Sequence, residues 1–303
     1  MRKLRFYLLM DKKLFASIID NYENLKYGLL NAQTFDENHF GFPEIYYKIM
    51  ESDEQRVNAF KKAFELHNNF KDAVVCEIGV GTLPLTKLYM PYVKKAYLIE
   101  NNPDLIPFIK EEVAKYDWAD KVEVLFADAL TVELPEKVDH IIGELMSIYC
   151  ANEFQVQIFQ HMRNYLKPDG HLFPNRIVNF ARLCEAEIDT DIHHYPVMFT
   201  RHQPMFLSQQ FLVNEIELLK EKKQGVKLSF SVPVLFSGTI NALYLESYVE
   251  VSEGANFTGT DSLMPPTVLK TTNTLEVKAG DLIHIDFSFN YGCSLDKISC
   301  VLS

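Results

Sequence analysis

The sequence lacks the cysteine patterns that mark zinc sites and disulfide-rich proteins. Its five cysteines are scattered without a CxxC pair, which argues against both. The adjacent histidines His193 and His194 have no acid or cysteine at a ligand spacing, so we expect a solvated loop there. We therefore expect no metal cofactor.

The sequence also lacks a long apolar run near its start and an excess of positive charge. The apolar run before Asp11 is only about five residues long, too short for a signal-peptide core or a membrane span. We therefore expect a cytoplasmic protein without a membrane partner. The formal net charge is −11, which argues against nucleic acid as a partner because an acidic surface repels phosphate. Such a surface would attract a cationic substrate, although solubility alone also explains the charge.

The pattern of apolar residues divides the chain into three parts. Residues 1–70 are predicted to be helical, and in Arg56–Phe70 the side chains of Val57, Phe60, Phe64 and His67 share one face. Residues 71–174 then alternate apolar runs with helical stretches, which predicts an α/β, Rossmann-like parallel sheet with helices on both faces. The predicted strands are Ala73–Ile78, Lys95–Ile99, Val122–Phe126 and Val138–Ile142; the predicted helices are Leu85–Tyr92, Pro103–Tyr116 and Asn152–Tyr165.

The character of the sequence changes at Lys167–Gly170, which has the composition of a turn. Beyond it, segments of alternating polarity predict antiparallel strands of a barrel or sandwich: Val226–Val234, Ala242–Val251, Leu275–Val277 and Leu282–Phe289. We place the boundary near Pro174. The expected units are an N-terminal helical cap (1–55), a nucleotide-binding sheet (56–174) and an antiparallel domain (175–303).

A nucleotide site is predicted where the first strand runs into the turn that contains Gly79 and Gly81. Glycine lets a ligand approach the backbone closely at the carboxyl end of a strand. Leu83 and Pro84 stand where a dinucleotide fingerprint has its third glycine, so the turn is more compatible with S-adenosylmethionine (SAM) than with NAD. Glu77, inside the strand, could contact the amino group of SAM or support the turn.

Acids at two further strand ends strengthen this prediction. Glu100 ends the second strand about 20 residues after the glycines, where a carboxylate can accept both ribose hydroxyls. Asp128 ends the third strand and could accept from the adenine amino group, or could cap a helix instead. We assign their neighbours Asn101 and Ala129 to the same cofactor site.

Two glutamates follow the fourth predicted strand, Glu144 and Glu153, nine residues apart. Two carboxylates that face one pocket repel each other, and a guanidinium between them removes the repulsion and donates forked hydrogen bonds. From the residues alone, solvated loop acids are the better explanation.

This segment resembles the double-glutamate loop of the protein arginine methyltransferase family, with Glu144, Met146 and Glu153 in register and Leu145 in place of a tryptophan. The resemblance covers most of residues 34–300. It includes the segments 132–139 and 166–174, which flank the loop, His39–Gly41, the region from Met50 to Phe60, and Ser237–Thr239.

The resemblance implies a class I SAM-dependent methyltransferase fold with N-terminal helices and a C-terminal antiparallel β-barrel. It implies that Glu144 and Glu153 are catalytic, that Arg56 and His39 help to bind SAM, and that Phe35 and Met146 contact the acceptor. It also implies a homodimer, with a dimerisation arm near Asp189–Phe206.

The sequence departs from the family pattern at two places. The aromatic helix is reduced to Phe35 within Thr34–Asn38, and Ser262–Met264 replaces a loop that carries a histidine. The expected acceptor is therefore the guanidino group of free arginine, a peptide, a protein or another guanidine. The alternatives are a small-molecule O- or N-methyltransferase with another acceptor, and a SAM-binding partner protein without activity.

Overall fold

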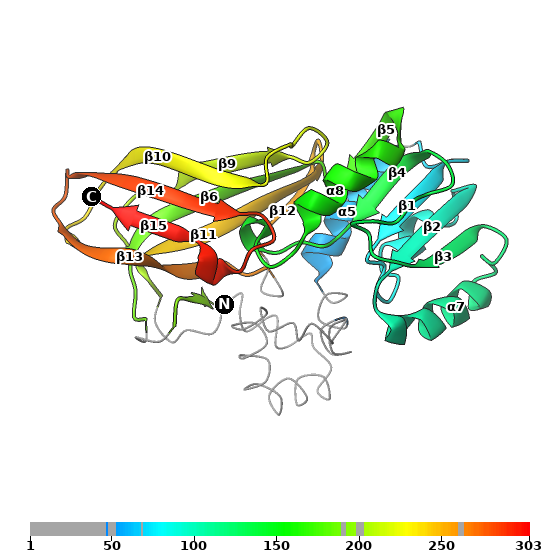
Figure 1. Ribbon diagram of the computed structural model, residues 1–303, viewed down its shortest axis with the longest axis horizontal. Helices are drawn as coiled ribbons and strands as arrows, with labels where there is room; N and C mark the ends of the chain where they lie inside the picture. The colour runs from blue at the N-terminus through cyan, green and yellow to red at the C-terminus, as the bar shows by residue number, and fades with distance from the viewer. Residues whose placement is uncertain (1–46, 48–52, 68, 189–191, 198–202, 260–263) are drawn as a thin grey trace.

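A computed structural model of the chain describes residues 47, 53–67, 69–188, 192–197, 203–259 and 264–303. Figure 1 shows a parallel sheet with helices beside a lobe of curled antiparallel strands. Buried side chains of both lobes belong to one continuous hydrophobic cluster, from Ala59 to Leu302. The division into three units near residues 55 and 174 stays a prediction, and most of the expected N-terminal cap lies outside the described residues.

The first lobe is a five-stranded sheet in the order β3-β2-β1-β4-β5 with every pairing parallel. Its strands are β1 (Val74–Ile78), β2 (Lys95–Glu100), β3 (Val122–Phe126), β4 (Val138–Gly143) and β5 (Leu166–Phe173). Every residue of β1 is buried, which explains why this central strand is apolar at every position except Glu77. The strand order reverses between β1 and β4, and ligands of open α/β sheets bind beyond the carboxyl ends of the strands at such a point.

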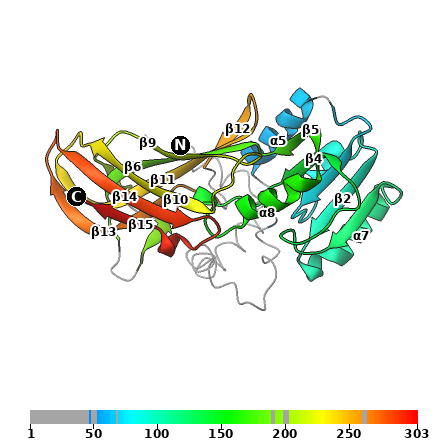
Figure 2. The same cartoon turned by 45° about the horizontal axis from the view of Figure 1, so that its top comes forward.

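Helix α5 (Glu54–His67) packs on this sheet and reaches the second lobe. Its buried face consists of Arg56, Ala59, Phe60, Ala63 and Phe64, and the Phe64 ring lies 5.5 Å from that of Phe173 at the end of β5. The same helix contacts β11 and β12 of the second lobe, as Figure 2 shows. The helix therefore joins the two lobes.

The other helices are short. They are α6 (Thr86–Tyr89), α7 (Ile106–Lys115) and α8 (Gln155–Met162), with 3-10 turns η1 (Pro103–Leu105), η2 (Ile148–Cys150) and η3 (Arg163–Tyr165). Each of these lies within a predicted helix except η2, which interrupts the segment between β4 and α8. A further 3-10 turn, η5 (Leu295–Lys297), belongs to the second lobe and was not predicted. None of the helices in the described residues is long and apolar enough to cross a membrane.

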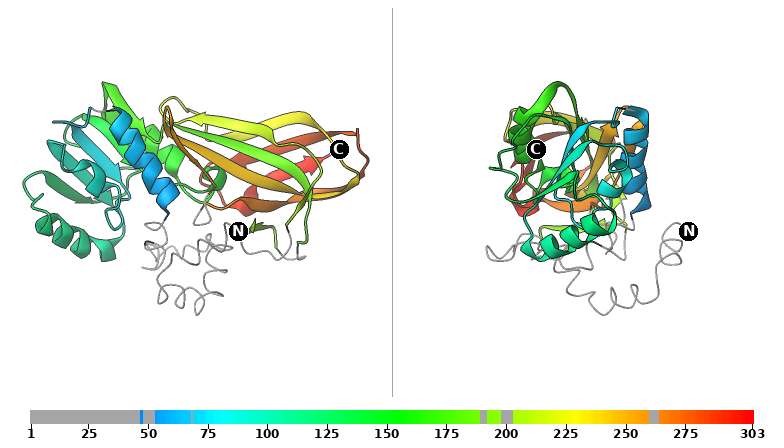
Figure 3. Two further views of the ribbon diagram at one scale, coloured as in Figure 1. Left: turned by 180° about the vertical axis from the view of Figure 1, so that it is seen from behind. Right: turned by 90° about the vertical axis from the view of Figure 1, so that its right-hand side faces the viewer.

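The second lobe consists of antiparallel strands that curl into a half-barrel, seen from behind in Figure 3. A seven-stranded sheet has the order β7-β13-β11-β6-β8 with β12 beside β11 and β9 beside β6, and a three-stranded sheet has the order β10-β14-β15. The strands are β6 (Arg176–Glu185), β7 (His194–Pro196), β8 (Met205–Phe206), β9 (Phe211–Glu217), β10 (Gly225–Pro233), β11 (Gly238–Ser252), β12 (Ala255–Thr258), β13 (Thr267–Val277), β14 (Leu282–Asn290) and β15 (Ser299–Leu302). Asn273 of β13 joins the two sheets because its side chain donates to and accepts from the backbone of Leu302.

Two local predictions are wrong. Strand β5 continues through Lys167–Gly170, where the composition predicts a turn, but it bulges there: Val138 of β4 lies opposite Leu166 and His140 lies opposite His171, so four residues of β5 face one residue of β4. His194 is buried on β7 and its Nδ1 lies 2.9 Å from Asp296 Oδ1, so it does not lie on a solvated loop, whereas His193 is exposed. Composition indicates only a tendency to form turns. The conformation of Lys167–Gly170 is set by pairing with β4, and that of His194 is set by pairing with β13.

Candidate active site

The residues predicted to bind cofactor and acceptor follow neighbouring parallel strands, so they lie at one edge of the sheet. Gly79 and Gly81 follow β1, Glu100 ends β2, Asp128 follows β3 and Glu144 follows β4. Because β1 and β4 flank the point where the strand order reverses, the glycine turn and Glu144 lie on either side of the expected crevice.

The glycine turn forms a cradle that no larger residue could form. Gly79 and Gly81 have φ of 66° and 52°, in the left-handed region that favours glycine. A Cβ on Gly79 would lie 2.4 Å from Leu145 Cδ2, and one on Gly81 would lie 3.2 Å from the ring of Tyr47. The turn is therefore enclosed by Leu145 of the glutamate loop on one side and by Tyr47 on the other.

Glu100 fixes this turn to the end of β2. One carboxylate oxygen accepts from the Gly81 N–H at 3.0 Å, and the other accepts from the N–H groups of Asn101 and Asn102 at 2.9 Å each. A carboxylate has about four acceptor sites, so these bonds leave capacity for ribose hydroxyls. The position fits a nucleotide-binding acid.

Asn102 and Tyr47 belong to this site although the sequence did not reveal them. The Asn102 side chain is buried; it accepts from the Asp104 N–H at 3.0 Å, and its Nδ2 donates to the Tyr47 hydroxyl at 3.2 Å. The signal that could have found Asn102 is its place two residues after the strand-end acid, at the start of a helical turn. Asn101, which the sequence did predict, is exposed.

Glu77 lies beneath the glycine turn. Its Oε2 accepts hydrogen bonds from Thr86 Oγ1 and from the Tyr89 hydroxyl, both at 2.6 Å, and the residue is only 2% exposed. Burial raises the pKa of Glu77 to about 7 although these two hydrogen bonds oppose the shift. These bonds tie the turn to α6, which favours the supporting role over contact with the SAM amino group.

Asp128 has a mainly local role in this structure. It is exposed, and its Oδ1 accepts from the Leu130 N–H at 2.9 Å, which caps a turn rather than a helix. Its neighbour Ala129 is buried. The second carboxylate oxygen is compatible with an adenine contact, so this role stays a prediction.

Arg56 connects the N-terminal helix to the glutamate loop. Its guanidinium is buried, with Nη1 donating to Glu144 Oε1 at 2.9 Å and with Nε and Nη2 donating to Asp53 Oδ2 at 3.2 and 3.0 Å. Burial opposes the charge, but Glu144 and Asp53 outweigh it and raise the pKa of Arg56. In this structure Arg56 binds Glu144 and Asp53, and its contact with SAM stays a prediction.

Glu144 and Glu153 lie close enough to repel each other. Burial raises the pKa of Glu153 to about 8, and the charge of Glu144 adds to this shift. Burial also raises the pKa of Glu144, although Arg56 opposes the shift. Each carboxylate would therefore gain from a nearby cation, as two acids that share a guanidinium do. Met146, between them in sequence, is buried and its N–H stabilises the Glu144 carboxylate.

The loop between the glutamates is strained. Tyr149, Cys150 and Asn152 have φ of 61°, 51° and 65°, and each non-glycine residue in this region costs about 1–2 kcal/mol. Such strain persists only where the surroundings fix the backbone. Asn152 is fixed by the turn after β14, because its N–H donates to the Cys293 carbonyl at 2.8 Å and its Oδ1 accepts from the Leu295 N–H at 3.3 Å.

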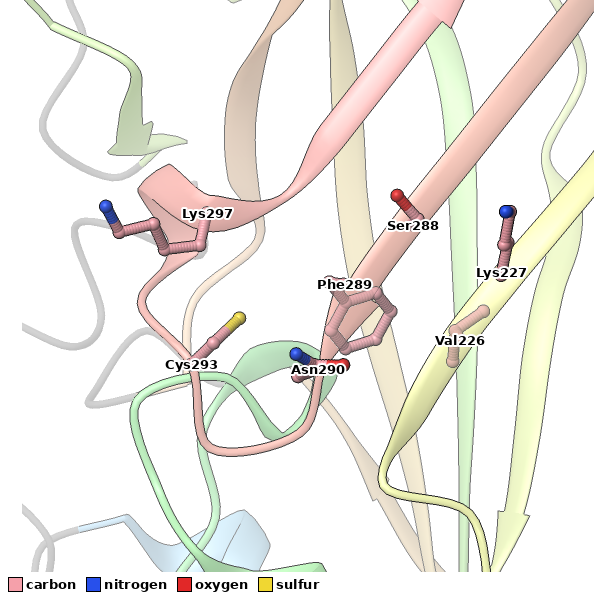
Figure 4. A pocket seen from close by; sticks show the side chains of 7 residues that line it. All are labelled: Val226, Lys227, Ser288, Phe289, Asn290, Cys293 and Lys297. Atoms are coloured by element: carbon pink, nitrogen blue, oxygen red, sulfur yellow. The ribbon is translucent and has the colours of Figure 1, made fainter.

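The same turn borders a pocket on the second lobe. Figure 4 shows Asn290 and Cys293 on the turn; the pocket is lined by Val226, Lys227, Ser288, Phe289, Asn290, Cys293 and Lys297. It contains neither glutamate. No group of three or more His, Cys, Asp and Glu within the described part of the chain could hold a metal ion. Phe35 and His39, predicted to bind acceptor and cofactor, lie outside the described residues.

The chain is similar to known arginine methyltransferases in sequence and in fold. The family model described as PRMT5 arginine-N-methyltransferase matches residues 30–173. Among curated relatives, an uncharacterized protein of Methanocaldococcus jannaschii is 25% identical over 84% of this chain and 95% of its own length. The histone-arginine methyltransferase CARMER of Drosophila ananassae is 28% identical over 84% of this chain, which spans about half (48%) of that relative.

Two solved structures share the fold. The Trypanosoma brucei PRMT1 enzyme–prozyme heterotetrameric complex with AdoHcy has a TM-score of 0.69 and 17% identity, covering 81% of this chain and 89% of that chain. The open conformation of Arabidopsis thaliana protein arginine methyltransferase 10 has a TM-score of 0.66 and 17% identity, covering 79% and 86%. At this identity they establish the architecture.

The chain thus has the fold of these structures, a Rossmann-like sheet joined to an antiparallel barrel lobe. The chain is similar to the PRMT5 arginine-N-methyltransferase family over residues 30–173, and to histone-arginine methyltransferases at 28% identity. The sequence-based alternatives, a methyltransferase with a non-guanidine acceptor and an inactive SAM-binding partner, are not favoured.

Proposed function

We propose that this chain transfers the methyl group of SAM to a guanidino nitrogen of arginine. The observation that carries the proposal is the pair of carboxylates, Glu144 and Glu153, on one strained loop beside the glycine turn. Burial raises the pKa of Glu153 to about 8, and repulsion from the Glu144 charge adds to this shift. A planar cation that donates two pairs of hydrogen bonds relieves this repulsion better than a neutral acceptor does.

The two glutamates have separate roles in this proposal. Glu144 already binds the Arg56 guanidinium through Oε1, so its charge is held in place before the acceptor arrives. Burial and the Glu144 charge both raise the pKa of Glu153, so its ionised form also gains from a cationic acceptor. A guanidinium is a poor nucleophile because its lone pairs are delocalised and its pKa is above about 12. Two carboxylates on the remote nitrogens localise positive charge there, and one of them can receive the proton that the reaction releases.

The residues at the strand ends fit SAM. Bound SAM would supply an electrophilic methyl group on its sulfonium sulfur. Gly79 and Gly81 leave room for the nucleoside, and Glu100 lies where ribose hydroxyls are accepted. Asn101, Asp128 and Ala129 border the same edge, and we propose that they complete the nucleoside site. We propose that Glu77 holds the turn in place from below.

We also propose which acceptor the chain methylates, how it assembles and where it is located. CARMER is named a histone-arginine methyltransferase, which supports arginine in a protein as the acceptor over free arginine or another guanidine. The T. brucei PRMT1 complex is a heterotetramer, which supports an oligomer here, and we propose a homodimer. A cytoplasmic location and the absence of nucleic-acid partners follow only from the sequence and are proposed on that basis.

The test is methylation by the purified chain with SAM and a panel of a histone, arginine peptides, free arginine and a phenol, with products identified by mass spectrometry. Glu144→Gln and Glu153→Gln are each expected to lower turnover by roughly 100-fold or more while SAM still binds. Glu133→Gln, an exposed acid just before β4, is the matched control and is expected to keep wild-type turnover. Near-normal turnover in either of the first two variants would refute the guanidinium clamp.

A further inference from the structure

A row of polar side chains crosses the otherwise apolar interior of the second lobe. Ser247 of β11 lies directly opposite Asn179 of β6, and Asn179 lies directly opposite Asn214 of β9. Ser247 and Asn179 are 1% and 0% exposed. Buried polar groups are costly unless they are fully hydrogen-bonded, so a polar row across three strands requires an explanation.

The row forms one continuous chain of hydrogen bonds. Ser247 Oγ donates to Asn179 Oδ1 at 2.7 Å, Asn179 Nδ2 donates to Asn214 Oδ1 at 3.0 Å, and Asn214 Nδ2 donates to the Tyr291 hydroxyl at 3.3 Å. Because each amide both accepts and donates, Asn179 fixes the direction of the Ser247 hydroxyl. The lone pairs of Ser247 are left to accept from a further donor.

That donor belongs to the loop between the catalytic glutamates. The Tyr149 N–H donates to Ser247 Oγ at 3.0 Å, and the Tyr149 hydroxyl donates to the Phe180 carbonyl of β6 at 2.8 Å. Tyr149 has a φ of 61°, which a bulky residue adopts only under constraint. The polar row therefore ends on the backbone of a strained residue, four positions before Glu153.

The far end of the row reaches the same loop by a second route. The carbonyl of Tyr291 accepts from Gln157 Nε2 of α8 at 2.7 Å, and the next residue, Gly292, donates its N–H to the Cys150 carbonyl at 2.8 Å. Figure 4 shows the turn after β14 on which these contacts lie. The loop is thus held at Tyr149 by β11 and at Cys150 by the residue that follows the end of the row.

We infer that Ser247 and Asn179 are positioning residues for methyl transfer, which hold the strained loop so that Glu153 faces Glu144 across the acceptor site. The inference rests on the proposed function. Neither residue touches the acceptor or the cofactor; each acts through the backbone of Tyr149. Loss of the Ser247 hydroxyl leaves the Tyr149 N–H without its acceptor and allows the loop to relax toward ordinary φ values.

The chain offers a matched control on the same two strands. Asn241 of β11 accepts from the Ala186 N–H and donates to the Ala186 carbonyl, both at 2.9 Å, at the other end of the lobe from the glutamate loop. Asn241→Ala therefore removes a comparable side-chain link between β11 and β6 without touching the loop. Ser247→Thr retains the hydroxyl and is the conservative variant.

The experiment compares Ser247→Ala, Asn179→Ala, Ser247→Thr and Asn241→Ala for acceptor kinetics, SAM affinity and the pH dependence of kcat/KM. A displaced catalytic group costs on the order of 100-fold, so Ser247→Ala and Asn179→Ala are expected to lower kcat/KM by roughly 10- to 100-fold. SAM affinity should stay within about twofold because the sites are separate. The apparent pKa in the kcat/KM profile should fall in Ser247→Ala as the two glutamates move apart. Ser247→Thr should restore much of the rate, and Asn241→Ala should match the wild type.

Hydrogen exchange at the Tyr149 amide tests the inference without relying on activity. Faster exchange in Ser247→Ala than in Asn241→Ala is expected. Equal exchange, or equal kinetics and pH profiles in these two variants, would overturn the positioning role while methylation by the wild type still stands. If the wild type methylates no guanidine acceptor, the proposed function fails instead, and faster exchange then still supports the constraint on the loop. Where Asn179→Ala does not fold, the two Ser247 variants decide the result.

Discussion

The raised pKa of Glu153 makes the proposed activity strongly dependent on pH in a range where an exposed glutamate would be fully ionised. In the free protein, burial and the neighbouring Glu144 charge raise the pKa of Glu153 from 4.5 to about 8. The acceptor guanidinium binds the ionised carboxylate. With a pKa of about 8, roughly 3% of Glu153 is ionised at pH 6.5 and about 90% at pH 9.

We therefore expect kcat/KM for an arginine acceptor to rise by roughly 30-fold between pH 6.5 and pH 9, because kcat/KM reports the ionisation of the free enzyme. The bound guanidinium stabilises the carboxylate and lowers its pKa, so kcat should change much less over the same range. The assay is initial-rate methylation at saturating SAM in buffers of constant ionic strength, with the acceptor varied at each pH.

Comparison with Glu153→Gln shows whether the rise of kcat/KM with pH is due to ionisation of Glu153. The variant should be much slower at every pH and should lack the rise toward pH 8. Glu77, with a pKa of about 7, titrates nearby, and SAM affinity measured over the same range separates its effect from that of Glu153. A flat wild-type kcat/KM profile, or the same rise in Glu153→Gln, would refute the assignment.

Three further predictions concern the surroundings of the site. Arg56→Met leaves the Glu144 and Asp53 carboxylates without their cation and should lower the free energy of unfolding by about 3–5 kcal/mol, measured by urea denaturation at neutral pH; an unchanged denaturation midpoint would contradict the pairing. Gly79→Ala places a Cβ 2.4 Å from Leu145 at a left-handed φ and should weaken SAM binding at least tenfold by calorimetry, an expectation that wild-type affinity would disprove. Burial lowers the pKa of His140 from 6.5 to about 4, so the folded chain should lose up to about 3 kcal/mol of stability as the pH falls from 6.5 to 4; His140→Phe should remove this loss, and parallel stability curves for the two proteins would show that His140 is not its source.

The sequence predicted the sheet well because its signals are local. Each of β1 to β4 is an apolar run of five or six residues, and the observed strands differ from the predicted ones by one residue at most. The strands of the half-barrel were harder to predict from the sequence. Only the final residues of β13 (Thr267–Val277) were predicted, because its first half pairs with β7 and β11 and owes its strand conformation to those partners rather than to alternation.

The acids of the site could be found from sequence because each follows a strand in a parallel sheet, where all the carboxyl ends meet at one edge. The contacts that these acids make could not be predicted from the sequence. That Glu144 shares its charge with Arg56 depends on how α5 packs across the sheet, and that Tyr149 lies on Ser247 depends on the register of β11 against β6. Tyr47 and Asn102 were missed for the same reason: neither has a motif, and both are defined by proximity to the glycine turn.

The ion pair between Arg56 and Glu144 joins positions 88 residues apart in sequence. A chain that loses Arg56 keeps the buried Glu144 carboxylate without this cation, so a substitution of Arg56 is better tolerated with a compensating change at position 144. Among related sequences, positions 56 and 144 should therefore change together. In sequences that lack both residues, we expect the loop after position 144 to have lost its role in methyl transfer.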